Sequence, residues 1–223
     1  MEIDDIQNDG NNIINENKNI IKTKSLENII NKEDIINFIS SKLYSIIHKN
    51  KLMRKKQSKG PNEPLFSKTI PVLNINKYLI RIMKYTEIEN NTLIVAYLYI
   101  IKLIKKENFV LGINNVYLLL LGSAVIAKKV LEDIKYDNSY YCTIGSLSNS
   151  DLNMIEYSVI TRIDFDVNLK MEDVNKVYVE IFKNLSQPRL NQIFKEANIN
   201  NININNINKE DNKKENVNNN KES

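Results

Sequence analysis

Few residues of this chain have the type and spacing that enzymatic chemistry or metal binding requires. The sequence has one histidine, His48, and one cysteine, Cys142, and no second Cys or His stands close to Cys142. Zinc ligation and a Cys-His dyad are therefore not expected. His48 stands near the basic end of an expected helix, where the helix dipole favours a cation. The sequence also has no phosphate-binding G-x-G-x-x-G or P-loop and no G-x-S-x-G motif.

The adjacent acids Glu132 and Asp133 are candidates for a catalytic pair by residue type alone. They stand at an expected helix end, where solvated carboxylates are usual and catalytic pairs are rare. The chain is therefore not expected to be an enzyme, and no metal or small-molecule cofactor is predicted.

Two ionisable residues stand where apolar side chains are expected. In the stretch SDLNMIEYSVITRIDF, residues 150–165, Glu156 lies about 40° from Leu152 on a helical wheel, inside the apolar stripe. Lys129 shares a helix face with four small or apolar residues, Leu118, Gly122, Val125 and Ile126. The reason for these two ions decides what the chain does.

Three interpretations of the two ions are open from the residues alone. Lys129 is in the last turn of its helix, where the helix dipole favours a cation and a long side chain can reach water. The two residues have opposite charges on successive long helices and could pair with each other. Alternatively, they border an apolar surface and present one donor and one acceptor to another protein.

The elements that position these ions are all expected to be helices, because apolar residues recur at helical spacing between residues 31 and 185. Asn31 is expected to cap a first helix, 31–50, which a linker, 51–70, follows. The later helices are expected at Ile75–Tyr85, Thr92–Lys106, Asn114–Glu132, Tyr140–Gly145, Ser150–Ile163 and Met171–Leu185. The second and third of these are apolar on nearly all sides, so other helices must surround them.

Composition indicates one domain with polar tails. The 223 residues are 42% hydrophobic, and 31 Lys plus Arg against 27 Asp plus Glu give a net charge of +4, which is no strong signal for nucleic-acid binding. Residues 1–30 and 198–223 are rich in Asn with almost no aromatics, so both are expected to be disordered. No signal peptide or membrane span is expected, and the single cysteine fits a reducing compartment, so the predicted location is the cytoplasm or the nucleus.

Residues 78–167, from YLIRIMKY to VITRIDFDV, resemble the cyclin box of the P/U-type cyclins, the class related to the yeast phosphate-pathway cyclin. The resemblance rests on four features in matching order and spacing: a Tyr-Leu-x-Arg-Ile helix, a buried second helix, an A-x-K…D-x-x-Y-x-N-x-x-Y segment and an L-N-x-x-E helix. It implies an all-α fold, a cyclin-box helical bundle of five core helices with an extra N-terminal helix and a C-terminal helix. The box would cover 74–167 within a single domain, 31–185.

The resemblance also implies that the chain is a regulatory subunit, which binds and activates a cyclin-dependent protein kinase. In cyclins, a lysine late in the third box helix and a glutamate in the fifth hydrogen-bond to main-chain groups just before the kinase's PSTAIRE-type helix. The matching positions here are Lys129 and Glu156. The matching apolar contacts are Ile126, Val130, Ile160 and Phe165.

The chain departs from the family's pattern at several positions. Ile101 and Lys102 stand where the family has Asp-Arg, and no MRAIL-type motif precedes them. Apolar packing is therefore expected in place of an internal ion pair, and substrate docking through an MRAIL-type patch is not implied. Tyr117 and Leu118 replace His-Arg, and Lys128 replaces a small residue, so two adjacent ammonium groups are candidates for the kinase contact.

Two alternative functions remain at this point. A cyclin-fold protein of the transcription-factor type would bind nucleic acid, and its complexes would weaken steeply with salt. The scarcity of Lys and Arg in the expected ordered region outside the basic run 51–59 argues against it. A helical adaptor for a partner other than a kinase would tolerate loss of both ions. The basic run 51–59 is itself either a solvated linker or a nuclear-import signal.

Overall fold

The computed structural model describes residues 26–53, 64–67, 69–107 and 109–196. Within these ranges all regular secondary structure is helical, which confirms the expected all-α class. The chain divides into two compact units: Ile30–Ile181 forms one, and the described residues 26–29 and 182–196 belong to the other. Residues 1–25 of the predicted N-terminal tail, 1–30, the whole predicted C-terminal tail, 198–223, and most of the basic run 51–59 lie outside the described residues.

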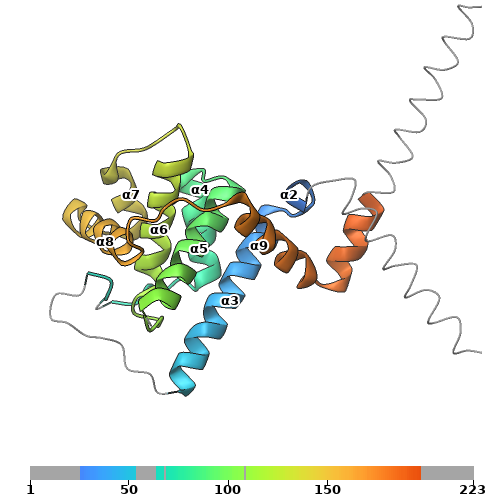
Figure 1. The fold of residues 1–223 in the computed structure, drawn as a ribbon, viewed down its shortest axis with the longest axis horizontal. Coiled ribbons are helices and arrows are strands. Elements are labelled where there is room, and N and C mark those ends of the chain that lie inside the picture. The colour runs from blue at the N-terminus through green and yellow to red at the C-terminus, as the bar shows by residue number, and fades with distance from the viewer. Residues whose placement is uncertain (1–25, 54–63, 68, 108, 197–223) are drawn as a thin grey trace, which may run out of the picture. The chain divides into compact units, whose positions relative to one another are not determined.

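The larger unit contains the helices of the expected bundle, apart from the last two residues of α9. Their bounds are α3 Lys32–Leu52, α4 Ile75–Thr86, α5 Asn90–Glu107, α6 Val116–Leu131, α7 Asn138–Gly145, α8 Asn149–Arg162 and α9 Met171–Lys183. Each predicted helix is present, with ends that differ from the expected ones by two residues or fewer. The five helices α4 to α8 form the core bundle, and α3 and α9 are the N-terminal and C-terminal additions (Figure 1).

Local side-chain caps explain where α3 and α8 begin. The Asn31 side chain accepts a hydrogen bond from the Asp34 N–H at 2.9 Å, and the Asp34 carboxylate accepts one from the Asn31 N–H at 3.1 Å. Ser148 and Asp151 make the same reciprocal arrangement before α8. Such capping boxes satisfy backbone donors that have no partner within the helix. The expected cap at Asn31 is therefore confirmed.

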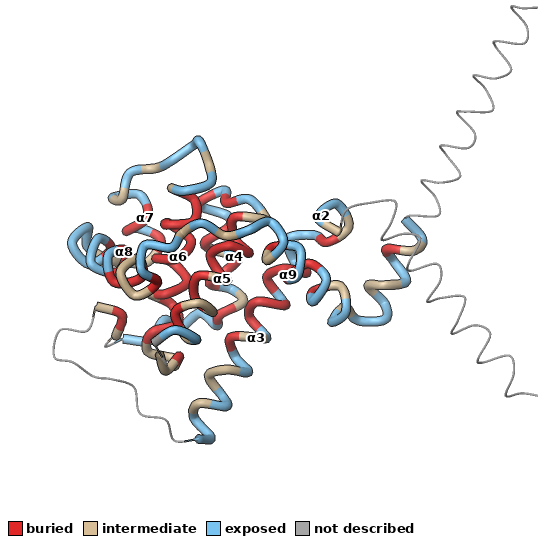
Figure 2. Tube along the Cα trace, in the orientation of Figure 1, coloured by how far each residue is buried: buried red, intermediate tan, exposed pale blue. Residues whose placement is uncertain are grey.

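The central helix of the unit is α6, which packs against α4, α5, α7 and α8. Residues 119–128 of α6 are all buried, and Figure 2 shows α5 and α6 buried along most of their length. A Cβ atom on Gly122 would lie 2.5 Å from Cγ2 of Ile155. The absence of a side chain at Gly122 thus lets α8 approach α6 closely.

The second unit contains helical residues that the sequence did not predict. Helix α2, Leu26–Ile29, lies within the segment that was expected to be disordered, and residues 187–196 form a further helix. Within this unit, Nη2 of Arg189 donates to the Ile29 carbonyl at 3.4 Å. Pro188 stands in the first turn of the helix 187–196, where the missing N–H of proline leaves no intrahelical hydrogen bond unmade.

Candidate functional site

The two ions singled out in the sequence meet at the junction of α6 and α8. Nζ of Lys129, in the last turn of α6, donates to Oε1 of Glu156 on α8 at 2.7 Å and to Oε2 at 3.0 Å. Of the three interpretations, mutual pairing describes the isolated chain. The pair is not sealed inside the bundle, because 34% of the Lys129 side chain and 12% of the Glu156 side chain are exposed.

A third residue, Asn138, joins both ions and was not among the predicted site residues. It is the first residue of α7, and its Oδ1 accepts from Lys129 Nζ at 2.7 Å. Its Nδ2 donates to Glu156 Oε2 at 2.9 Å and to Asn153 Oδ1 at 2.6 Å. We call Lys129, Asn138 and Glu156 the polar cluster. Asn138 is the Asn of the D-x-x-Y-x-N-x-x-Y spacing, so this motif could have identified it as a candidate site residue.

The four predicted apolar contact residues have very different exposures. Ile126 is only 2% exposed and belongs to the interior of the bundle, and Ile160 is half-buried. Val130, next to Lys129, is 43% exposed, and Phe165, just after α8, is 65% exposed. Of the four residues, Val130 and Phe165 therefore expose the most apolar surface, and Ile160 exposes a smaller part.

The two adjacent lysines at the end of α6 differ in how deeply they are buried. The Lys128 side chain is 3% exposed and forms an ion pair with Glu132, while Lys129 reaches α7 and α8. Glu132 also accepts from the Glu89 N–H at 2.9 Å, just before α5 begins. The doublet therefore divides into an interior cation, Lys128, and a partly exposed one, Lys129.

The expectation that Glu132 is a solvated helix end is wrong. Its side chain is only 8% exposed. Burial raises the pKa of the Glu132 carboxyl, but hydrogen bonds from Lys128, the Glu89 N–H and Thr92 outweigh burial and leave this pKa below its ordinary value. Glu132 is thus an ionised link between the end of α6 and the start of α5.

The other residues with reactive side chains do not gather into a site. Cys142 is buried, its Sγ lies 3.2 Å from Oδ1 of Asn149, and burial raises the pKa of its thiol. His48 is exposed on α3. Among the described residues, no three His, Cys, Asp or Glu side chains are placed to hold a metal ion. Within the same residues, no helix has the length and apolar character needed to cross a membrane.

Lys102 keeps an ionic contact although the family's Asp-Arg pair is absent. Its ammonium pairs with the carboxylate of Asp166 and donates to the Asp166 carbonyl at 2.9 Å. Ile101, the other departure, is half-buried on α5. The charge at residue 102 therefore connects α5 to the segment that follows α8.

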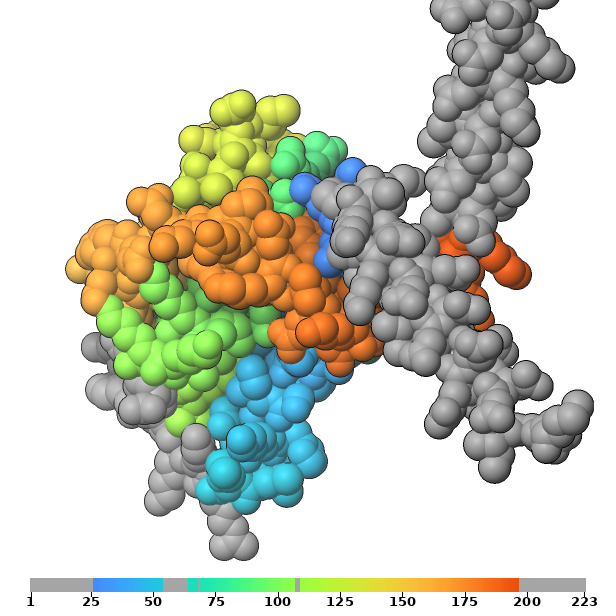
Figure 3. Space-filling model, turned by 45° about the vertical axis from the view of Figure 1, so that its right-hand side comes forward, coloured from blue at the N-terminus to red at the C-terminus, as the bar shows by residue number. Residues whose placement is uncertain are grey.

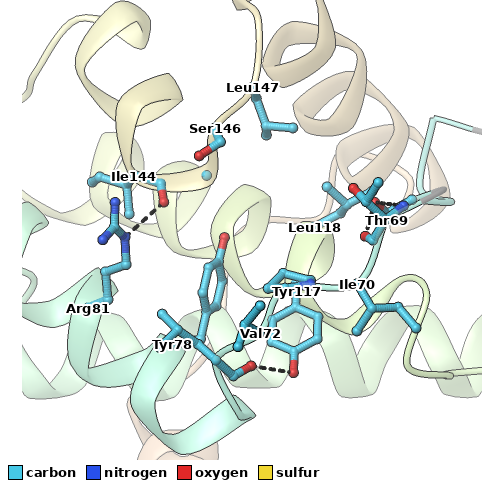
Figure 4. Close-up of a pocket in the computed structure, with 14 residues that line it drawn as sticks. Thr69, Ile70, Val72, Tyr78, Arg81, Tyr117, Leu118, Ile144, Ser146 and Leu147 are labelled. Carbon is cyan, nitrogen blue, oxygen red and sulfur yellow. Dashed lines mark hydrogen bonds between the residues drawn. The ribbon is translucent and has the colours of Figure 1, made fainter.

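A cavity of about 390 Å³ lies where α4, α6 and the end of α7 meet Ser67 and the segment 69–73 (Figure 4). The Tyr117 hydroxyl donates to the Leu73 carbonyl at 2.8 Å, and Nε of Arg81 donates to the Ile144 carbonyl at 3.0 Å. Burial raises the pKa of the Tyr78 hydroxyl, which lines this cavity. None of the six predicted site residues lines it, so the cavity is separate from the polar cluster.

Comparison with known proteins gives the class to which this fold and site belong. Residues 5–167 match the Cyclin family, which is well over half of the chain. The chain is 34% identical to Cyclin-U1-1 of Arabidopsis thaliana over 139 residues, 60% of this chain and 66% of that protein. It is 29% identical to Cyclin-U4-1 of the same plant over 164 residues, 72% of this chain and 81% of that protein. The chain belongs to the cyclin family.

The relatives also indicate the type of cyclin. The chain is 29% identical to the PHO85 cyclin-like protein psl1 of Schizosaccharomyces pombe over 118 residues, 52% of this chain and 49% of that protein. The chain thus spans between about half and four fifths of the length of these three relatives. It is a P/U-type cyclin, as the sequence resemblance predicted.

Proposed function

We propose that this chain is the regulatory subunit of a cyclin-dependent protein kinase and activates it by docking the kinase's PSTAIRE-type helix beside α6 and α8. The observation that carries this proposal is that the polar cluster lies partly open, while Val130, next to Lys129, and Phe165, just after α8, expose apolar surface. The relatives are cyclins, one of them named a PHO85 cyclin-like protein, which supports the role.

The polar cluster has the chemistry to bind main-chain groups of a partner. A carboxylate offers about four acceptor positions, and three hydrogen bonds reach Glu156, two from Lys129 and one from Asn138. One acceptor position is left for an N–H group of the kinase. The three donors of the Lys129 ammonium are engaged by Asn138 and by both oxygens of Glu156. A kinase carbonyl would therefore take the place of one of these contacts, and the partial exposure of the ammonium leaves room for that exchange.

Apolar contact would supply most of the affinity, and the cluster would fix the register. Covering Val130 and Phe165 removes apolar surface from water, which favours association without specifying orientation. Hydrogen bonds from Lys129 and to Glu156 specify it, because a misplaced partner would leave these groups desolvated and unpaired.

Activation then follows from selective binding. The kinase helix moves between inactive and active positions, and a protein that binds only the active arrangement shifts the population by its differential affinity. Holding the helix inward completes the Lys-Glu ion pair of the kinase. Phosphoryl transfer takes place entirely on the partner.

The test is capture of a kinase by the full chain and by the double variant Lys129→Ala with Glu156→Ala. The natural chain is expected to retain a cyclin-dependent kinase, identified by mass spectrometry, and to raise the phosphorylation rate of that kinase after purification. The double variant is expected to lose both activities, because each truncation leaves a kinase group unpaired.

A matched control removes a different lysine and glutamate from the same unit. Lys42 of α3 pairs with Glu180 of α9, and neither residue belongs to the polar cluster. Lys42→Ala with Glu180→Ala should therefore leave capture unchanged. Equal capture by the natural chain and the cluster double variant would contradict the proposal, as would loss of capture in the control alone.

A further inference from the structure

The turn that follows α8 has an unfavourable backbone conformation and exposes an aromatic side chain to solvent. Asp164 and Phe165 have φ values of 54° and 55°, in the left-handed region that residues with a Cβ avoid. Phe165 is also 65% exposed. Two consecutive left-handed residues, neither of them glycine, persist only where surrounding contacts hold them in place.

Contacts from α5 hold both sides of this turn. Lys106 pairs with the carboxylate of Asp164, and Lys102 pairs with the carboxylate of Asp166. Lys102 Nζ also donates to the Asp166 carbonyl at 2.9 Å. The two lysines are four residues apart on α5, so they lie on one face of that helix.

The residues just beyond Asp166 are fixed by the same helix. The Tyr99 hydroxyl donates to the Val167 carbonyl at 2.7 Å, and Tyr99 is buried. Figure 3 shows the orange segment that follows α8 lying directly beside the green of α5. Phe165 is therefore bracketed by residues that α5 holds, while its own ring stays exposed.

We propose that Lys102 and Lys106 are positioning residues, which hold the Asp164–Asp166 turn so that Phe165 is aimed at the kinase partner. This inference rests on the proposed function. Both ion pairs have exposed carboxylates, with 57% of the Asp166 side chain and 70% of the Asp164 side chain accessible. Such pairs contribute little to global stability. What they provide is order in the turn before binding, which lowers the entropy lost when Phe165 is covered.

Because the chain has no tryptophan, the fluorescence of an indole introduced at residue 165 can be measured without background from other indoles. In the Phe165→Trp chain, the single indole reports on the turn. Its fluorescence anisotropy decay should show restricted local motion. Adding the double change Lys102→Gln with Lys106→Gln should increase the amplitude of fast local motion without lowering the melting temperature. The double change Lys102→Arg with Lys106→Arg should restore the restricted motion, because both cations are retained.

The matched control is Lys105→Gln, which removes a positive charge from the same helix. Lys105 has no ion pair with any described residue. Lys105→Gln should therefore leave the indole as restricted as in the Phe165→Trp chain. A change as large as that of the Lys102 and Lys106 double variant would mean that loss of charge on α5, and not the two contacts, sets the motion.

The binding measurement uses a purified cyclin-dependent kinase with a PSTAIRE-type helix as the probe. The kinase should shift the indole emission of the Phe165→Trp chain to shorter wavelength, and the two Lys→Gln changes should weaken binding by about tenfold. Unchanged anisotropy and unchanged affinity in that double variant would overturn the positioning role. If the natural chain itself binds no kinase, the proposed function fails, and the anisotropy comparison still decides whether the lysines order the turn.

Discussion

Lys128 and Lys129 are neighbours in sequence, but their ammonium groups contact different partners in the fold. Lys128 is 2% exposed and pairs with Glu132, which is hydrogen-bonded to the start of α5. Lys129 contacts Glu156 on α8 and Asn138 on α7. The same residue type thus supplies a structural cation at one position and a candidate binding group at the next.

Replacing each lysine by methionine should separate these two roles. Lys128→Met leaves Glu132 buried without its ion-pair partner and should lower the free energy of unfolding by about 3 to 5 kcal/mol. Lys129→Met removes an ammonium that is 34% exposed and leaves Glu156 its hydrogen bond from Asn138, so it should lower this free energy by less than Lys128→Met does. Urea denaturation measures both values. Kinase capture by the Lys129→Met chain should be lost although the chain stays folded, and equal destabilisation by the two variants would contradict the division.

We expect Asn138 to belong to the kinase-binding site, although it was not among the site residues predicted from the sequence. Asn138→Ala removes the amide that holds Lys129 and Glu156 together, so we expect kinase binding to weaken by about tenfold, or 1.4 kcal/mol. The melting temperature should change little. Titration with purified kinase gives the affinity.

Asn153→Ala is the control for this change. Asn153 is exposed and contacts Asn138 but neither ion. Its loss should leave affinity within about twofold of the natural chain, because the carboxylate and ammonium keep their other hydrogen bonds. If Asn153→Ala weakens binding as much as Asn138→Ala, the amide of Asn138 has no special role in arranging the ions.

Local signals in the sequence were sufficient to predict the helices α3 to α9, but not α2 or the helix at 187–196. Asn31 and Ser148 start their helices through side chains three residues from their partners, which a reader of the sequence can recognise. The pairing of Lys129 with Glu156 was also among the open interpretations, because wheel positions placed both ions on apolar faces.

Long-range contacts explain what the sequence did not predict. Glu132 is buried where its carboxylate accepts a hydrogen bond from the N–H of Glu89, which is 43 residues away. No local sequence pattern predicts this contact. The left-handed turn at Asp164 and Phe165 has no glycine to mark it. Its geometry depends on ion pairs with α5, so only the packed structure reveals it.

The Glu132 carboxyl should make stability depend on pH in a defined direction. Its pKa is lower in the folded chain than its ordinary value of 4.5, so the folded state favours the ionised form. The resulting stabilisation is complete above the ordinary pKa and is lost as pH falls through the lower, folded pKa. Urea denaturation of the natural chain and of Glu132→Gln should show the full difference at neutral pH and a shrinking one below 4.5. A difference that stays constant down to acidic pH would exclude Glu132 as its source.

The close approach of α6 and α8 at Gly122 should be testable with a double-mutant cycle. A Cβ at this position meets Cγ2 of Ile155 at 2.5 Å, so Gly122→Ala must displace a branched side chain in the core. Overpacking of this kind costs about 1 to 3 kcal/mol, which exceeds the gain of about 1 kcal/mol in helix propensity. Ile155→Ala removes the clashing methyl group, so in that background Gly122→Ala should cost less or become stabilising. Unfolding free energies of the four chains measure the coupling, and additive effects would show that the two helices are not in the contact described.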